Sequence, residues 1–181
     1  MIMLVDGPSG SGKTTLATRL GILLRLPVIH MDDFYPGWSG LAAGSDIIAT
    51  SVLKTTDPGY YRWDWANDRA GEWVPVPPGA KIIEGAGAVT AETLRAASIS
   101  DPRVAAIMLT GDTSTRYRRA MRRDPYYEPY WEMWAEQEQH HYAAQPTDLG
   151  DLIPTLRIDT TRLDAGQVVR RAYDFIAYYV E

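Results

Sequence analysis

The chain has 181 residues, of which 45% are hydrophobic, and this length and composition predict one compact domain. Its formal net charge of −5 argues against a general affinity for nucleic acid, whose phosphates bind to basic surfaces. Because there is no cysteine, disulfides, thiolate zinc sites and cysteine nucleophiles are excluded, and three histidines make a histidine metal centre unexpected. We therefore expect a protein that acts on a small-molecule substrate.

The sequence also bears on location. No apolar run approaches the roughly 20 residues that a membrane-spanning helix needs. A strand-like run begins at residue 2, which leaves no room for a signal peptide. We expect a cytoplasmic protein without a membrane partner, and the sequence does not indicate an oligomeric state.

Short apolar runs alternate with helix-like segments along the chain. The predicted strands are 2–5, 26–30, 81–84, 104–109 and 155–159. The predicted helices are 15–25, 44–54, 90–98, 113–123, 128–143 and 164–180. This alternation indicates βαβ units and predicts an α/β fold, a three-layer sandwich with a five-stranded parallel sheet. The segment 55–79 is rich in Gly, Pro and Trp, and we expect it to leave the sheet and shape a pocket.

The most informative motif lies between the first strand and the first helix. Residues 7–14 read GPSGSGKT and match the Walker A pattern G-x-x-x-x-G-K-[ST]. A strand that turns through glycines into a helix directs several backbone N–H groups to one point, where the helix dipole adds positive charge. Lys13 can reach the outer phosphates of a nucleotide, and the Thr14 hydroxyl can bind Mg²⁺. The motif predicts binding of a nucleoside triphosphate, which we expect to be ATP. The predicted nucleotide-binding residues are Gly7, Ser9, Gly10, Ser11, Gly12, Lys13, Thr14 and Thr15.

Acidic residues follow two predicted strands, at the edge of a parallel sheet where ligands bind. Asp32 and Asp33 follow the second strand, where paired carboxylates can accept a proton or organise Mg²⁺ and its waters. The alternative is a solvated turn in which an aspartate caps a helix. Glu84 ends the third strand, where it can order Mg²⁺ through water or serve only as a polar strand end.

Two further clusters can contact ligands. Arg116, Arg119 and Arg123 fall on one face of the predicted helix 113–123. A guanidinium cluster suits phosphate oxygens and the charge of phosphoryl transfer, and the alternative is a solvated basic face. The segment 60–65 reads YYRWDW. Its rings can stack on a base or sugar while Arg62 and Asp64 bind hydroxyls or carbonyls, or it forms a β-hairpin whose aromatic residues cover the sheet.

With these motifs, the chain resembles the uridine kinase and nicotinamide riboside kinase group of P-loop kinases over most of its length. The similarity is strongest in residues 6–15, DGPSGSGKTT, and it continues in MDDFY at 31–35 and IIEG at 82–85. It also includes the Arg-x-x-Arg-x-x-x-Arg-Asp pattern at 116–124 and the aromatic-Asp pair in RWDW at 62–65. The chain departs from uridine kinases after Asp64, where Trp-Ala-Asn replaces a His-Pro pair.

The resemblance implies a nucleoside monophosphate kinase-like fold and roles for particular residues. Asp32 takes the place of the catalytic base, supported by Asp33, and Asp64 takes the place of the residue that holds the ribose hydroxyls. An arginine-bearing helical lid is implied near 112–130. The residues then expected at the acceptor site are Asp32, Asp33, Tyr35, Arg62 and Asp64. Lys13, Arg119 and Arg123 are expected to act in catalysis, Arg116 to bind the nucleotide, and Thr14 and Glu84 to hold Mg²⁺.

We therefore expect ATP-dependent phosphoryl transfer to a hydroxyl of a small molecule, and a nucleoside is the first expectation for the acceptor. Trp131 and Trp134 are expected to close its site. One alternative is a kinase for another alcohol, such as an antibiotic, a sugar or a cofactor precursor. Another is a P-loop ATPase or nucleotide switch without kinase activity. Against that, the chain lacks the Asn-Lys-x-Asp motif of GTPases, and its third strand ends in Glu-Gly rather than Asp-Glu.

Overall fold

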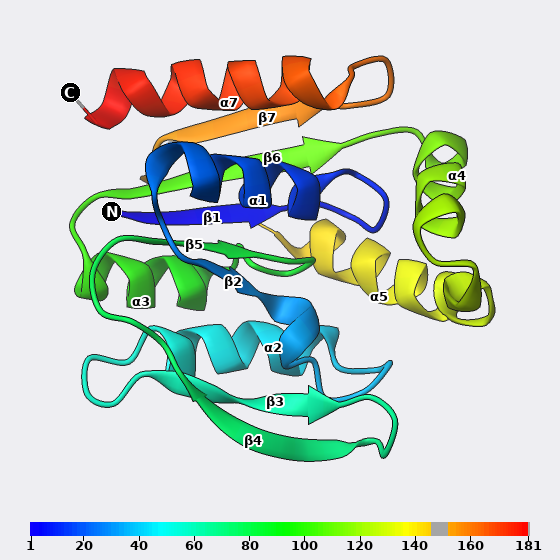
Figure 1. Ribbon diagram of the computed structural model, residues 1–181, viewed down its shortest axis with the longest axis horizontal. Coiled ribbons are helices and arrows are strands. Elements are labelled where there is room, and N and C mark those ends of the chain that lie inside the picture. The colour runs from blue at the N-terminus through cyan, green and yellow to red at the C-terminus, as the bar shows by residue number, and fades with distance from the viewer. Residues whose placement is uncertain (146–151, 181) are drawn as a thin grey trace.

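A computed structural model describes residues 1–145 and 152–180. Its centre is a five-stranded sheet whose neighbouring strands all run parallel, in the order β2-β5-β1-β6-β7 (Figure 1). The strands are β1 (Ile2–Asp6), β2 (Val28–His30), β5 (Lys81–Glu84), β6 (Val104–Thr110) and β7 (Thr155–Asp159). The α/β fold with a five-stranded parallel sheet, predicted from the alternating pattern, is confirmed.

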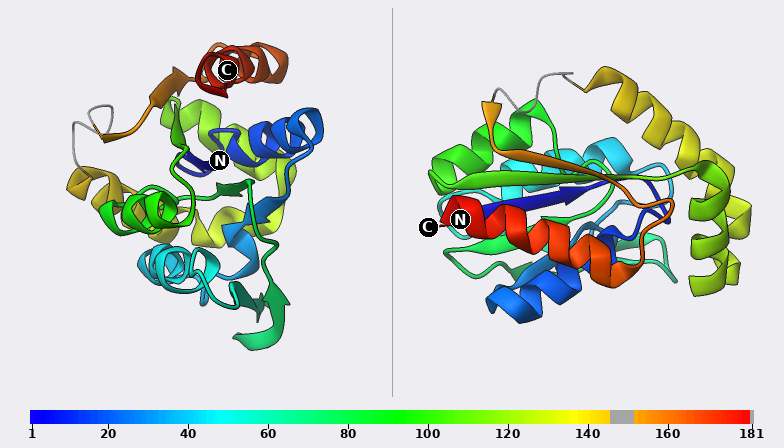
Figure 2. Two further views of the ribbon diagram at one scale, coloured as in Figure 1. Left: turned by 90° about the vertical axis from the view of Figure 1, so that its left-hand side faces the viewer. Right: turned by 90° about the horizontal axis from the view of Figure 1, so that it is seen from above.

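Helices cover both faces of the sheet (Figure 2). Alternate residues of a strand point to opposite faces, so Ile2 and Leu4 of β1 join one hydrophobic core while Met3 and Val5 join the other. The helices that cover the Met3 face are α1 (Lys13–Leu24) and α7 (Ala165–Val180). Those that cover the Ile2 face are α2 (Leu41–Ile47), α3 (Ala91–Ser100) and α5 (Trp131–Ala144). Burial on both faces explains why β1 reads as a continuous apolar run.

Several predicted boundaries shift in the structure. The strand expected at 26–30 begins at Val28. The helix expected at 44–54 is α2 followed by a π-helical turn, Ile48–Val52. The helix expected at 128–143 begins later, because a 3₁₀ segment with two prolines, η3 (Pro125–Tyr130), precedes α5. The arginine-bearing helix α4 (Thr113–Arg123) has the predicted bounds, and Asp112 caps it by accepting a hydrogen bond from Thr115 N at 2.8 Å.

The segment 55–79 leaves the main sheet, as expected, and forms a hairpin. Its strands β3 (Gly59–Asp64) and β4 (Arg69–Pro75) make a separate antiparallel sheet, seen at the bottom of Figure 1. Tyr60 packs into the core against Phe34, with ring centroids 4.7 Å apart. The hairpin therefore packs against the segment after β2, including the 3₁₀ turn η1 (Met31–Asp33), instead of covering the five-stranded sheet.

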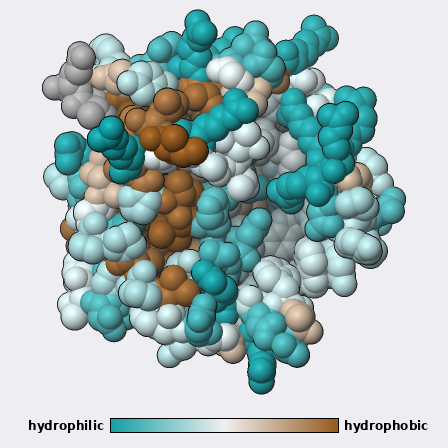
Figure 3. Space-filling model, in the orientation of Figure 1, coloured by the Kyte–Doolittle hydropathy of each residue, from teal (hydrophilic) through white to brown (hydrophobic). Residues whose placement is uncertain are grey.

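All five strands end at the same edge, on the right in Figure 1, where α4 crosses beyond them. In Figure 3, hydrophilic and pale residues surround a hollow on this side of the molecule, whereas hydrophobic residues gather on the other side. The strand ends thus meet a polar, open region, where ligands of parallel sheets bind. None of the helices described is both long and apolar enough to cross a membrane.

Candidate active site

The loop between β1 and α1, residues 7–14, is shaped by glycine and is called the phosphate loop below. Gly10 has a φ of 75°, and a Cβ atom there would lie 2.1 Å from the carbonyl oxygen of Arg116. Gly12, with a φ of 96°, is the residue that caps α1, and it provides no side-chain hydrogen bond. The first backbone N–H groups of α1 are therefore open to a ligand, as in sites that bind phosphate at helix N-termini.

A cavity of about 450 Å³, called the first cavity, opens at this helix terminus. Six of the predicted nucleotide-binding residues line it: Gly10, Ser11, Gly12, Lys13, Thr14 and Thr15. Arg119 and Arg123 of α4 form a second wall, and the turn after β7 forms a third. Of the other predicted nucleotide-binding residues, Gly7 donates its N–H to Asp6 at 2.6 Å, and Ser9 lines a different cavity.

The first cavity has groups that fit a nucleoside triphosphate with Mg²⁺. The Ser11 hydroxyl is buried and has no hydrogen-bond partner among the described residues. Lys13, 8% exposed, lies beside the open amides, and Leu163 and Val168 give the cavity an apolar end that suits a base. The Thr14 hydroxyl donates to Glu84 Oε2 at 3.2 Å, which brings together the two predicted Mg²⁺ residues.

Glu84 is itself held by a histidine that the sequence did not single out. His30, the last residue of β2, places Nδ1 2.6 Å from Oε1 of the buried Glu84. This hydrogen bond raises the pKa of His30, and burial of the ring opposes the rise. Within residues 1–145 and 152–180, no three His, Cys, Asp or Glu side chains are grouped to hold a metal ion. A metal at Thr14 would therefore take most of its ligands from phosphate and water.

A second cavity, of about 430 Å³, lies beside the first. Lys13 and Arg123 line both cavities, so the two meet at these cations. Aromatic side chains from several elements dominate its wall. They are Tyr35, Trp38, Trp65, Tyr127, Tyr130 and Trp134. The remaining lining residues include Ser9, Asp32 and Asp124.

The two predicted carboxylates after β2 face different surroundings. Asp32 is exposed and lines the second cavity near Lys13, and its carbonyl oxygen accepts a hydrogen bond from Trp65 Nε1 at 3.0 Å. Asp33 instead accepts a hydrogen bond from the Tyr60 hydroxyl at 3.2 Å. The predicted acceptor residue Tyr35 also lines the cavity, and its hydroxyl donates to the Ala86 carbonyl at 2.8 Å. Of the two carboxylates, Asp32 is therefore the one that lines the second cavity.

Arg62 and Asp64, also predicted for the acceptor site, lie on the hairpin and are not among the residues that line the second cavity. Arg62 forms an exposed ion pair with Glu72 at 3.3 Å. Asp64 closes the turn of the hairpin by accepting a hydrogen bond from Asn67 Nδ2 at 2.7 Å, which lowers the pKa of Asp64. Both side chains therefore have partners within the hairpin.

The three arginines of the predicted lid have different partners. Arg116 donates from Nη1 to the Ser9 carbonyl at 3.0 Å and lies outside both cavities. Arg119 donates to Oγ1 and the carbonyl oxygen of Thr160, at 3.0 and 2.8 Å, in the wall of the first cavity. Arg123 is exposed where the two cavities meet. Of the expected closing residues, Trp134 lines the second cavity, whereas Trp131 packs on Tyr117 with ring centroids 5.3 Å apart.

No family model matches this sequence, and no curated protein matches it. Solved structures resemble it over nearly their whole length. A sugar kinase from Janibacter sp. HTCC2649 is 17% identical with a TM-score of 0.64, covering 97% of this chain and 94% of that one. A gluconokinase from Sinorhizobium meliloti 1021 is 18% identical with a TM-score of 0.60, covering 97% and 91%. A deoxyadenosine kinase from M. mycoides is 13% identical with a TM-score of 0.55, covering 98% and 99%. The chain has the fold of the P-loop kinases.

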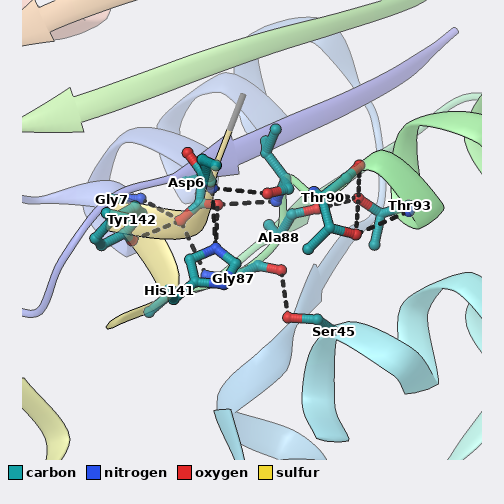
Figure 4. A network of polar contacts seen from close by, with 12 residues as sticks. Asp6, Gly7, Ser45, Gly87, Ala88, Thr90, Thr93, His141 and Tyr142 are labelled. Atoms are coloured by element: carbon teal, nitrogen blue, oxygen red, sulfur yellow. Dashed lines mark hydrogen bonds and ion pairs between the residues drawn. The ribbon is translucent and has the colours of Figure 1, made fainter. Parts of the chain in front are cut away.

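Within this P-loop kinase fold, a buried aspartate fixes the start of the phosphate loop (Figure 4). Asp6, fully buried at the end of β1, accepts hydrogen bonds from Gly7 N at 2.6 Å, Gly87 N at 3.0 Å and Val89 N at 2.8 Å. The Tyr142 hydroxyl of α5 donates to it at 2.7 Å. An acidic residue that ends an apolar strand before a glycine loop is a signal that could have predicted this role.

Proposed function

We propose that this protein is an ATP-dependent kinase that phosphorylates a hydroxyl of a small molecule. The observation that carries the proposal is the meeting of two cavities at Lys13 and Arg123. Phosphoryl transfer requires a nucleotide and an acceptor side by side, whereas an ATPase or a switch needs the phosphate site alone. Several structural neighbours are small-molecule kinases, which adds support.

The first cavity would bind the nucleotide. The open amides of α1 and Lys13 hold the β- and γ-phosphates, and Arg119 lies along the same wall. Thr14 would hold Mg²⁺ and Glu84 would orient its waters, since the two side chains are joined at 3.2 Å. When bound, Mg²⁺ neutralises charge on the phosphates. Arg116 would act at one remove, because its guanidinium holds the loop at Ser9.

Asp32 would receive the proton of the acceptor hydroxyl. As the hydroxyl oxygen bonds to the γ-phosphorus, the bond from that phosphorus to the bridging oxygen of ADP breaks. Arg123 and Lys13 stabilise the charge that develops between the two ligands, because both line the two cavities. Closure of the lid, residues 112–130, would exclude water and so limit hydrolysis of ATP.

The charges around the second cavity bear on the acceptor. Among its lining residues in the described chain, the cations are Lys13 and Arg123, which also face the nucleotide. The other charged residues are the carboxylates Asp32 and Asp124. An acidic acceptor would thus lack a cation of its own, while a flat, neutral molecule could stack on the aromatic wall. These features favour a nucleoside, as the resemblance to uridine kinases implies, over an acidic sugar.

The second candidate is a neutral alcohol that is not a nucleoside. The position of Asp64 favours it, because the residue that the resemblance assigns to the ribose is hydrogen-bonded within the hairpin turn. A ribose would then depend on Asp32 or Asp124 for recognition of its hydroxyls. The two candidates differ in the acceptor alone and share the nucleotide site.

A panel of acceptors tests the function directly. ATP consumption with Mg²⁺ is measured without acceptor, with ribonucleosides, with their 2′-deoxy and 5′-monophosphate counterparts, and with neutral and acidic sugars. We expect a ribonucleoside to raise consumption at least about tenfold, with formation of a phosphorylated product, and the monophosphates to be inactive. Stimulation by sugars alone would favour the second candidate. Rapid consumption that no acceptor changes would contradict kinase activity.

A further inference from the structure

A buried carboxylate of α5 contacts the phosphate loop from outside both cavities. Glu138 is 3% exposed, and its Oε1 accepts hydrogen bonds from Ser9 N at 2.7 Å and Ser9 Oγ at 2.8 Å. Its Oε2 lies 3.8 Å from Nη1 of Arg116, which donates to the Ser9 carbonyl at 3.0 Å. The amide, the hydroxyl and the carbonyl of Ser9 are therefore all held by two side chains that do not belong to the loop.

Stability alone does not account for a carboxylate at this position. Burial raises the pKa of Glu138, since a charge in the interior is costly, and the nearby charge of Lys13 and the bonds from Ser9 oppose that rise. Replacing a buried charged group by a well-packed apolar one is often neutral or stabilising. What an apolar residue could not do here is accept two hydrogen bonds from one residue of the phosphate loop.

Ser9 lies at a sensitive point of the site. It lines the second cavity and precedes Gly10, the first loop residue that lines the first cavity. The hydroxyl of Tyr127, another residue of the second cavity, lies 3.0 Å from Ser9 Oγ. A shift of Ser9 would therefore displace the amides that follow it in the loop.

We propose that Glu138 is a positioning residue for nucleotide binding. By holding the amide and hydroxyl of Ser9, it keeps the first half of the phosphate loop in the conformation that directs the following amides and Lys13 into the nucleotide cavity. Glu138 acts through Ser9, and the effect requires a side chain long enough to accept hydrogen bonds from both the amide and the hydroxyl of Ser9. The proposal rests on the nucleotide-binding part of the proposed function and is independent of the acceptor.

Two conservative variants separate reach from charge. Glu138→Gln loses the charge but keeps an oxygen that can accept both bonds, whereas Glu138→Asp keeps the charge on a side chain one methylene shorter. Binding of a non-hydrolysable ATP analogue with Mg²⁺ is measured by calorimetry. We expect E138D to bind about tenfold more weakly than wild type, and E138Q to stay within about threefold. Glu136→Asp, on the exposed face of the same helix, is the matched control and should bind as wild type.

Steady-state kinetics with an active acceptor provide a readout that mere destabilisation would not give. E138D should raise the KM for ATP, while kcat at saturating ATP falls less than about threefold. Wild-type binding by a folded E138D, or tighter binding by E138D than by E138Q, would overturn the proposal. If E138D does not fold, loss of binding by a folded E138Q would overturn it, and retention would support it. A wild-type protein that does not bind the analogue would contradict the proposed function itself.

Discussion

The two cavities are built in contrasting ways. In the first, the phosphate loop and the start of α1 contribute consecutive residues, 10–15. The wall of the second is assembled from the phosphate loop, the segment after β2, the hairpin, the loop after β5, the end of α4, η3 and α5. The loop wall of the first cavity is therefore specified by local backbone geometry, whereas the wall of the second depends on how distant segments pack. Substitutions can test whether this difference in construction is also a division of labour between nucleotide and acceptor.

The largest effect is expected from Lys13→Ala, because Lys13 belongs to both cavities. Loss of its charge should lower kcat on the order of 10⁴-fold, as for other cations that stabilise phosphoryl transfer. The melting temperature measured by calorimetry should change by less than about 5 °C, since the change removes no large apolar contact. Near-normal turnover in a folded variant would contradict the role assigned to Lys13 and the proposal that transfer takes place where the two cavities meet.

Asp32→Asn should act on the acceptor side alone. We expect kcat to fall about 10³-fold, because the hydroxyl loses its proton acceptor, while the affinity for ATP stays unchanged. Asp33→Asn is the control, since Asp33 bonds to Tyr60 instead of lining the cavity. Turnover and nucleotide binding are measured for both. A larger loss for Asp33→Asn would mean that the base is the neighbouring residue.

Arg123→Ala tests the place where the two cavities meet from the side of the predicted lid. Because Arg123 is exposed between the two cavities, its loss should lower kcat about 10²-fold with a smaller effect on either KM. Arg118→Ala, on the same helix, should leave kcat unchanged, since Arg118 donates to Thr115 at 3.1 Å and lines neither cavity. Equal effects of the two substitutions would indicate a general basic surface.

A neighbouring pair on the hairpin can sharpen the account of the acceptor. Trp65→Ala should raise the KM for the acceptor about three- to tenfold, because it removes one aromatic wall of the second cavity. Asp64→Ala should raise it less than about threefold, since Asp64 serves the turn. Tyr61→Ala, 59% exposed and packed on Trp73, controls for changes in the hairpin. A dominant effect of Asp64→Ala would restore the ribose role that the resemblance implies.

The smallest expected effect concerns pH and the Glu84 pair. The hydrogen bond to Glu84 raises the pKa of His30 above its ordinary value of 6.5. The stabilisation that protonated His30 gains from this bond is therefore fully present below pH 6.5. That contribution is lost as pH rises through the folded-state pKa. Between pH 6 and pH 9, the free energy of unfolding should fall by on the order of 0.5 kcal/mol more for wild type than for His30→Gln. The difference is small because water screens the partly exposed ring. Urea unfolding of both variants measures this, and identical losses would refute it.

The sequence predicted those features that are determined by residues close together in the chain or by the order of the strands. The glycine loop specifies its own geometry, and the strand-end rule places Glu84 beside Thr14 because β5 adjoins β1. The positions of Arg62 and Asp64 were harder, since the register of the hairpin shifts between Tyr61 and Trp63. Such an irregularity changes which side chains face a cavity, and no alternation pattern reveals it.

Other contacts lay beyond local patterns altogether. Glu138 and Ser9 are 129 positions apart in the sequence, so their bond depends on the path of α5 across the sheet edge. Aromatic residues cluster at 126–142 in the sequence. Which of them face the second cavity depends on the 3₁₀ segment with two prolines, Pro125 and Pro129, that precedes α5. These features require tertiary packing, which pattern and spacing do not encode.

The contacts at the far end of α5 have a mechanical consequence. Tyr142 is bonded to Asp6, and the Gln145 side chain donates to the Val89 carbonyl at 2.8 Å, so the helix is fastened to the sheet near its last turn. Four positions earlier in the same helix, Glu138 is bonded to Ser9. Because α5 is held to Asp6 and to Ser9 at once, a displacement of the helix would disturb the residue before the phosphate loop and the loop itself together.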